Sequence, residues 1–274
     1  MSVARPWEEH SLTVELLTRG GREMKTESLR GLGPVTRPLT ICENPAMTDL
    51  TGNTLFDGPA GSIEAILKEP PQEVTRAAIV CHPHPLFGGT MHNKVVFRIA
   101  RAFQDSGFAV LRFNFRGTGK SEGTHDDGRG EQDDLRSAIQ FIEGKYPRAE
   151  LWLAGFSFGA AVVLRAGCGD DRVRALVVAG APGSKYDFRN VRPCNKPKLF
   201  VQGALDEFGS AEDLKNLIAT LEGINELKII EGADHFFEGH LPALFESVSG
   251  FIAAVEEKPP TAQPQRTRGN SEMV

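Results

Sequence analysis

Residues 151–164 read Leu-Trp-Leu-Ala-Gly-Phe-Ser-Phe-Gly-Ala-Ala-Val-Val-Leu. The apolar first half is typical of a buried strand, and the Ala/Val/Leu second half is typical of a buried helix. Ser157 therefore lies on a sharp turn between them, in the pattern Gly-x-Ser-x-Gly. Gly155 and Gly159 suit a turn that brings neighbouring backbone segments close together. The stretch predicts a serine that is held in a strained backbone conformation and exposed above a sheet.

The segments around this turn alternate between strand and helix patterns. Two short extended runs around a turn-rich linker predict an initial hairpin, at 54–56 and 62–67. A continuous apolar run predicts a strand that is buried on both faces at 77–81, and further strands are predicted at 109–115, 175–179, 198–202 and 227–230. Amphipathic segments predict helices at 95–106, 133–145, 211–221 and 241–255. The order predicts an α/β fold with a mostly parallel central sheet and helices on both faces.

A single domain accounts for most of the 274 residues. Residues 1–46 lack sustained periodicity, so we predict a loosely ordered N-terminal extension and hypothesise that Met47 is the biological start. The α/β domain is predicted at 47–256. Residues 257–274 are rich in proline and polar side chains and are predicted to form a disordered tail.

Charge and composition narrow the classes of partner and compartment. The formal net charge of -5 argues against attraction to nucleic acid or to an anionic membrane surface. No apolar run approaches the roughly 18–20 residues of a membrane span, and the first residues lack the apolar region of a signal peptide. We therefore predict a cytoplasmic protein, a monomer or small homo-oligomer, with a small molecule as its partner.

The cysteines carry no recognisable pairing or metal-binding pattern. They are dispersed without C-x-x-C spacing, at Cys42, Cys81, Cys168 and Cys194. We interpret all four as free thiols in a reducing compartment, where disulfides are rare.

A serine nucleophile needs a base to take its proton and a carboxylate to orient that base. With this strand order, both are expected on loops that leave later strands, in the order serine, acid, histidine. Asp206 follows the strand predicted at 198–202, and His235 follows the strand predicted at 227–230. We therefore predict a catalytic triad of Ser157, Asp206 and His235.

Two other carboxylates are substitute candidates for the acid. Glu207 lies one residue further along the loop than Asp206. Asp234 is adjacent to His235 in sequence, so its side chain is expected to point elsewhere. Both therefore rank below Asp206.

The negative charge that develops on a substrate carbonyl oxygen requires two preorganised N–H donors. One is expected from Phe158, the residue after the nucleophile, at the start of a helix whose dipole favours negative charge. The other is expected from the loop after 77–81. Pro83 and Pro85 cannot donate, which leaves the amide of His84 as the first candidate and that of Leu86 as the second.

Two further motifs are similar to ligand sites. Gly119-Lys120-Ser121 matches part of a phosphate-binding loop, but the full pattern needs glycine at position 114, which is Asn114, and no helix pattern follows. The histidines within 82–92 lack a carboxylate or accessible cysteine to complete a metal site, because Cys81 is predicted to be buried. We predict neither a nucleotide nor a metal site, and no cofactor.

Four blocks together give the chain a specific resemblance to the α/β-hydrolase superfamily, and within it to small bacterial members. They lie at 81–96, 113–123, 155–160 and 232–237, and the match spans about residues 53–255. The resemblance implies a serine hydrolase with Ser157, Asp206 and His235 as its triad and an oxyanion hole at His84 and Phe158. Members of this group are described as esterases or peptidase-like hydrolases of unsettled substrate. The extension at 1–46 departs from the pattern.

Many such enzymes carry a cap domain ahead of the strand that bears the acid. Here only residues 180–197 intervene, which is too short for a helical cap. We therefore predict an open, shallow pocket for short acyl groups. Its predicted border consists of Leu86, Phe87, Phe156, Phe158, Tyr186, Phe188 and Phe208.

These features predict a serine hydrolase that cleaves small carboxylic esters through an acyl-enzyme. A peptidase, amidase or acyltransferase on the same triad is an alternative, because the pattern identifies the nucleophile and not the leaving group. A non-catalytic binding module with the hydrolase fold is the alternative from another class.

Overall fold

A computed structural model describes residues 52–257 apart from 184, 187, 189–190 and 192. The predicted extension at 1–46, the hypothetical start at Met47 and the predicted tail from 258 onward lie outside the described residues.

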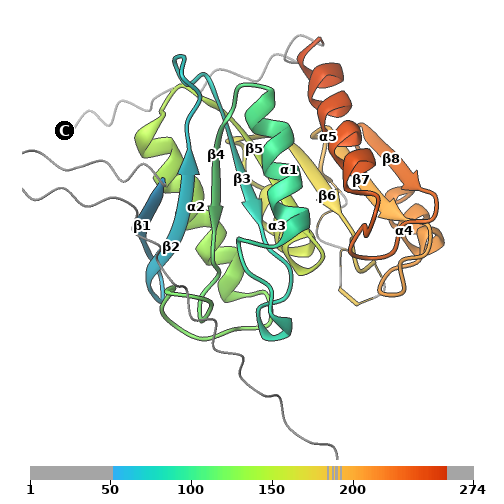
Figure 1. Cartoon of the computed structure of the whole chain (residues 1–274), viewed down its shortest axis with the longest axis horizontal. Helices are drawn as coiled ribbons and strands as arrows, with labels where there is room; N and C mark the ends of the chain where they lie inside the picture. Colours follow the sequence, from blue (N-terminus) through green and yellow to red (C-terminus); the bar gives the residue numbers. More distant parts are fainter. Residues whose placement is uncertain (1–51, 184, 187, 189–190, 192, 258–274) are drawn as a thin grey trace, which may run out of the picture. The chain divides into compact units, whose positions relative to one another are not determined.

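An eight-stranded sheet forms the centre of the fold, with the strand order β1-β2-β4-β3-β5-β6-β7-β8 (Figure 1). Its strands are β1 (Asn53–Gly58), β2 (Gly61–Lys68), β3 (Arg76–Cys81), β4 (Ala109–Phe113), β5 (Glu150–Phe156), β6 (Val173–Ala179), β7 (Lys198–Gly203) and β8 (Asn225–Ile230). The first two form an antiparallel hairpin, and β2 also pairs antiparallel with β4. All pairings from β4 through β3 to β8 are parallel. The predicted hairpin and mostly parallel sheet are confirmed.

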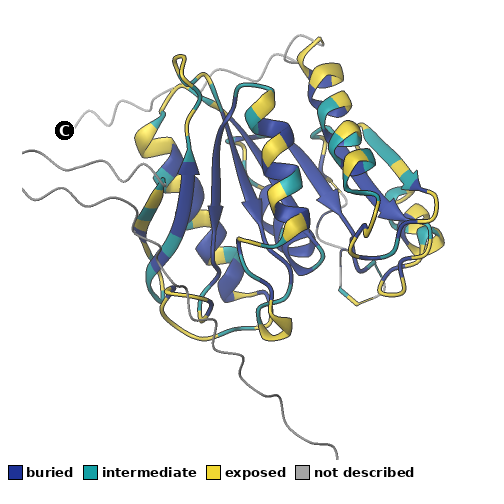
Figure 2. Ribbon diagram, in the orientation of Figure 1, coloured by how far each residue is buried: buried dark blue, intermediate teal, exposed yellow. Residues whose placement is uncertain are grey.

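Five α-helices of the described region cover the two faces of this sheet. They are α1 (Lys94–Asp105), α2 (Gly130–Lys145), α3 (Phe158–Gly167), α4 (Ala211–Ile218) and α5 (Leu241–Glu256). Successive side chains of a strand point to opposite faces, so β3 sends Ile79 into the core beneath α2 and α3, and Val80 into the core beneath α1 and α5. Figure 2 shows the central strands as buried and the outer faces of the helices as exposed. The predicted α/β layering is confirmed.

The loop after β3 contains a short 3₁₀ helix, η1 (Pro85–Phe87), which sequence patterns did not predict. Pro85 occupies its first turn, where a fixed φ and a missing N–H are tolerated. Gly88 ends the turn with φ 75°, a left-handed conformation that favours glycine. Asn93 then starts α1, because its side chain accepts hydrogen bonds from the amides of Val95 and Val96.

The interpretation of all cysteines as free thiols is wrong for two of them. Cys168 and Cys194 form a disulfide, with their Cα atoms 5.1 Å apart. Cys168 directly follows α3, and Cys194 precedes β7, so the fold joins residues whose spacing in the sequence gives no sign of pairing. Cys81 is a buried free thiol, and burial raises its pKa. Cys42 lies outside the described residues. The cysteines therefore no longer support a reducing compartment.

Within the part of the chain that the structure describes, no helix combines the length and the apolar character needed to cross a bilayer.

Candidate active site

Three predicted site residues meet where the parallel strands end. Ser157 follows β5, Asp206 follows β7, and His235 follows β8. The Nε2 atom of His235 lies 3.0 Å from Ser157 Oγ, and its Nδ1 atom lies 2.8 Å from Asp206 Oδ2. In the tautomer that fits both contacts, Nδ1–H donates to the carboxylate and Nε2 accepts from the serine hydroxyl. The arrangement can transfer a proton from Ser157 to His235.

The backbone at Ser157 is strained. Its φ is 56° and its ψ is -117°, and a non-glycine residue at positive φ costs on the order of 1–3 kcal/mol. The flanking glycines make the turn possible, since a Cβ at Gly155 would come within 2.3 Å of Gly159 O and a Cβ at Gly159 within 2.5 Å of Cys81 O. The close backbone approach predicted from the sequence is confirmed.

The carboxylate of Asp206 is fully enclosed by hydrogen-bond donors. Its Oδ1 atom accepts from the amides of Phe208, at 2.8 Å, and Gly209, at 3.1 Å. Its Oδ2 atom accepts from Gln202 Nε2 at 2.7 Å in addition to His235. Sequence reasoning missed Gln202, although a polar side chain in an otherwise apolar buried strand was a usable signal.

The two substitute acids lie elsewhere. Asp234 accepts a hydrogen bond from the amide of Glu238 at 2.9 Å. Glu207 is exposed. In the described region, neither carboxylate contacts the His235 ring, so geometry favours Asp206 as its partner.

Aromatic rings hold His235 in place on two sides. The ring centroid of Phe156 lies 5.0 Å from that of His235, and the centroid of Phe208 lies 4.6 Å away. Gly180 has φ 56°, and a Cβ there would come within 2.8 Å of the Phe156 ring. Packing therefore limits the rotation of the imidazole between its two hydrogen-bond partners.

The predicted oxyanion donors are two backbone amides, one in the loop after β3 and one at the start of α3. Phe158 is the first residue of α3, and the amides of Phe158 and His84 have no acceptor among the described residues. The amide of Leu86, by contrast, donates to His84 Nδ1 at 3.3 Å. Burial, with a smaller effect of His125, lowers the pKa of His84, which agrees with a neutral ring that accepts at Nδ1. This geometry favours His84 over Leu86.

The loop that carries His84 is anchored at its start by His82. This buried imidazole has Nδ1 2.6 Å from Pro83 O and accepts from the amide of Phe115 at Nε2, at 3.0 Å. Burial lowers the pKa of His82 to about 4, so the ring is neutral near pH 7. Its nitrogen atoms are thus engaged in structural contacts. Among the described residues, no group of three or more His, Cys, Asp or Glu side chains is placed to hold a metal ion.

The same loop is anchored at its other end through the peptide of Met91. The Met91 amide donates to Asn114 Oδ1 at 2.8 Å, and the Met91 carbonyl accepts from Arg112 Nη1 at 2.9 Å. Asn114 is itself fixed, because its Nδ2 atom donates to Glu64 Oε2 at 2.8 Å. Residues at the end of β4 therefore hold both ends of the loop around His84.

A cavity of about 460 Å³ opens beside Ser157 and His235. Of the predicted border, Phe87, Phe158, Tyr186 and Phe208 line it. The side chains that sequence reasoning missed come from three loops and the start of α1. The missed lining residues are Pro83, Gly88, Gly89, Asn93, Pro182, Lys185 and Phe236.

Three of the predicted pocket residues do not line this cavity. Leu86 is 70% exposed on the outside of η1. Phe156 points into the core beneath His235, because its place in the strand alternation matches that of Trp152 and Ala154. Phe188 is packed in the core beneath α3. Strand alternation and tertiary packing, and not proximity in sequence to Ser157, therefore decide which residues line the cavity.

Comparisons with known proteins agree with this fold. A family model described as the alpha/beta hydrolase fold matches residues 80–209. An uncharacterised protein of Rickettsia prowazekii is 34% identical over 73% of this chain and 88% of its own length. A Xanthomonas campestris structure described as an α/β serine hydrolase without lid is 36% identical, with a TM-score of 0.71 over 81% of this chain and 100% of the other. An α/β serine hydrolase homologue from Coxiella burnetii is 38% identical, with a TM-score of 0.69 over 72% and 95%.

Proposed function

This chain belongs to the α/β-hydrolase family, with serine hydrolases among its relatives, and from this premise we propose that it cleaves small carboxylic esters through an acyl-enzyme. The observation that carries the proposal is the hydrogen-bonded line from Ser157 Oγ through His235 to Asp206, at 3.0 and 2.8 Å. A serine that is aligned in this way has a base to take its proton and a carboxylate to stabilise the resulting imidazolium.

In the first half of the reaction, Ser157 Oγ attacks the ester carbonyl carbon while His235 Nε2 takes the hydroxyl proton. The C–O bond to the alcohol then breaks, and the imidazolium returns the proton to the departing alcohol oxygen. In the second half, His235 takes a proton from water, whose oxygen attacks the acyl carbon, and the carboxylic acid leaves as Ser157 regains its proton. Asp206 stays ionised and orients His235 throughout.

The tetrahedral intermediates carry negative charge on the former carbonyl oxygen. We assign its two donors as the amides of His84 and Phe158, which have no acceptor within the described residues. The start of α3 adds the positive end of a helix dipole at the same place. Donors that are fixed before the reaction stabilise the charge without reorganisation.

The size and lining of the cavity suit a substrate whose acyl or alcohol group is small and largely apolar. Its volume of about 460 Å³ falls in the range of small-molecule sites, and five of its lining residues are phenylalanine or tyrosine. The five rings are those of Phe87, Phe158, Tyr186, Phe208 and Phe236. The described residues between β6 and β7 form no α-helix that could cover it.

Labelling by a fluorophosphonate tests the proposal. Ser157 is expected to react stoichiometrically, because only a serine with an activated hydroxyl attacks this reagent. Intact mass and peptide mapping would locate the label, and His235→Ala, which removes the base, is the matched control expected to prevent it. Labelling without turnover of any ester or matched anilide would exclude hydrolysis. If the amine is released from the anilide faster than the alcohol is released from the matched ester, the protein is an amidase.

Replacing Asn114 with leucine tests whether the loop around His84 is held by β4. The substitution removes the acceptor for the Met91 amide, and we expect kcat for a short p-nitrophenyl ester to fall by about 10–100-fold, with KM changed less. Misplacement of an oxyanion donor weakens transition-state binding more than substrate binding, which produces this split.

Asn225→Leu is the matched control for that variant. The Asn225 side chain also bonds to the backbone, where it donates to the Leu221 carbonyl, but it lies at β8, far along the sheet from β4. Both variants should lose stability in urea denaturation, and only Asn114→Leu should lose kcat. An equal loss of kcat in both variants would contradict the positioning role.

A further inference from the structure

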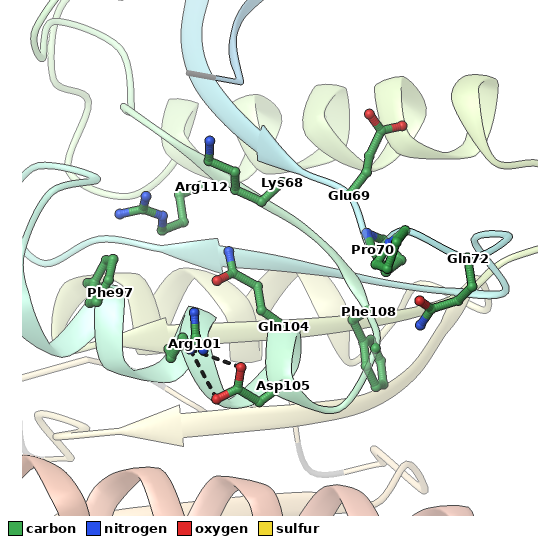
Figure 3. Close-up of a pocket in the computed structure, with 12 residues that line it drawn as sticks. Lys68, Glu69, Pro70, Gln72, Phe97, Arg101, Gln104, Asp105, Phe108 and Arg112 are labelled. Carbon is green, nitrogen blue, oxygen red and sulfur yellow. Dashed lines mark hydrogen bonds and ion pairs between the residues drawn. The ribbon is translucent and has the colours of Figure 1, made fainter. Parts of the chain in front are cut away.

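A second cavity lies beside the ends of β2 and β4, next to α1 (Figure 3). Its volume is about 680 Å³, larger than the cavity at Ser157, and the two share no lining residue. Lys68 and Arg112 contribute to it from the strands, and Phe97 and Gln104 from α1. We call this cavity the β2–β4 groove.

Strand register places two positive charges close together in the β2–β4 groove. Ile66 of β2 pairs directly with Arg112 of β4, and Lys68 pairs with Val110. Lys68 and Arg112 are therefore diagonal neighbours on the same face of the sheet, a relation that brings long side chains within reach of each other. Like charges that lie within reach of each other repel, and an anion between them would relieve this repulsion.

The acids that line the groove are engaged with other cations. Asp105 pairs with Arg101 at 2.9 Å. Glu69 pairs with Lys145 at 3.5 Å and accepts a hydrogen bond from the Tyr146 hydroxyl. Neither carboxylate is therefore free to neutralise the strand cations.

Arg112 is only 7% exposed, yet it has no carboxylate partner among the described residues. Its contacts are the hydrogen bond from Nη1 to Met91 O and the Phe97 ring, whose centroid lies 5.4 Å from Cζ. Burial lowers the pKa of the guanidinium, as expected for a charge without a counter-ion. Lys68 likewise has no acidic partner in the described region. A buried charge without a partner is costly, and an external anion would offset that cost.

We propose that the β2–β4 groove binds a small organic anion, with its carboxylate or phosphate between Lys68 and Arg112 and its apolar part against Phe97. The guanidinium suits a planar or tetrahedral oxyanion, since its N–H groups form a fork that donates two parallel bonds. The Phe97 ring is 52% exposed and gives an apolar surface beside that charge. The side-chain amide of Gln104 adds a polar group at the α1 wall.

Titration of the full chain by ligand-observed NMR and calorimetry tests the site. The probes are benzoate, phenyl phosphate, inorganic phosphate and neutral benzamide. Benzoate or phenyl phosphate should bind at least about tenfold more tightly than benzamide, because the ionic hydrogen bonds are lost in the amide. Preference for benzoate would indicate a carboxylate ligand, and preference for either phosphate would indicate a phosphate ligand. Absence of saturable binding of every anionic probe would overturn the proposal.

Two lysine variants locate the binding. Lys68→Met should weaken anion binding by about tenfold or more, whereas Lys185→Met should leave it unchanged. Lys185 is a matched control because it is an exposed lysine without an acidic partner among the described residues, and it lines the cavity at Ser157. A loss confined to Lys185→Met would place the anion in that cavity, and equal affinities in both variants would also overturn the proposal.

Arg112→Met should abolish anion binding. Circular dichroism of the variant would show that the loss does not come from unfolding. The test does not depend on hydrolysis, since binding is measured without turnover. It can be repeated on protein whose Ser157 has been blocked.

Discussion

Replacement of Ser157 by alanine is expected to lower kcat for a short p-nitrophenyl ester by about 10⁶-fold, the scale seen when a triad nucleophile is removed. The variant lacks the oxygen that forms the acyl-enzyme, so only direct attack by water within the oxyanion site remains. Steady-state assays, with active sites titrated to exclude contamination by the native enzyme, would measure the loss. A kcat within about tenfold of the native value would show that Ser157 is not the nucleophile.

Stability separates this loss of activity from loss of the fold. Alanine meets the same strain as serine at φ 56°, so Ser157→Ala should unfold at about the same urea concentration as the native protein. Ser157→Gly should be equally inactive, yet more stable by about 1 kcal/mol, because glycine tolerates this conformation. An inactive but more stable glycine variant would show that the turn holds the serine in place at the expense of stability.

The second large effect is expected for Asp206→Asn, which should lower kcat by about 10⁴-fold. Both carboxylate oxygens of Asp206 accept hydrogen bonds, from the Phe208 and Gly209 amides on one side and from Gln202 and His235 on the other. An amide NH₂ group at either position would face another donor. If it faces His235, it favours the tautomer with the proton on Nε2, which cannot take the proton of Ser157.

Asp234→Asn and Glu207→Gln are the controls for the acid. Each is expected to keep kcat within a few-fold of the native value, because neither carboxylate contacts the His235 ring in the described structure. A larger loss for Asp234→Asn than for Asp206→Asn would identify Asp234 as the working acid. The two Asp→Asn changes are chemically identical, so the comparison isolates position.

Much of the fold could be predicted because hydrophobic periodicity is a local property of the chain. Strands that are buried on both faces are mostly apolar, and the helices that cover them are amphipathic, so both appear in the sequence before any contact is known. The positions of Asp206 and His235 were predictable for a related reason. Parallel strands end at one edge of the sheet, so polar residues just after them are brought together.

Pairings that depend on distant segments could not be predicted in this way. The Cys168–Cys194 disulfide joins the end of α3 to the segment before β7, and neither cysteine carries a local signal of the other. The pocket border was wrong at Phe156 and Phe188 for the same reason. Both are aromatic residues near the site in sequence, but packing places them in the core.

By itself, the sequence determined the order of strands and helices, the turn at Gly155-Phe156-Ser157-Phe158-Gly159, and the serine, acid and histidine that follow three strands. These features depend on local periodicity, on glycines that allow close backbone approach, and on chain order. Only the tertiary structure decided the anchoring of the Met91 peptide by Arg112 and Asn114, the contact of Gln202 with Asp206, and the proximity in the β2–β4 groove of two cations without an acidic partner among the described residues. Those contacts arise from side-chain directions and strand register across the sheet, and neighbouring residues along the chain do not encode them.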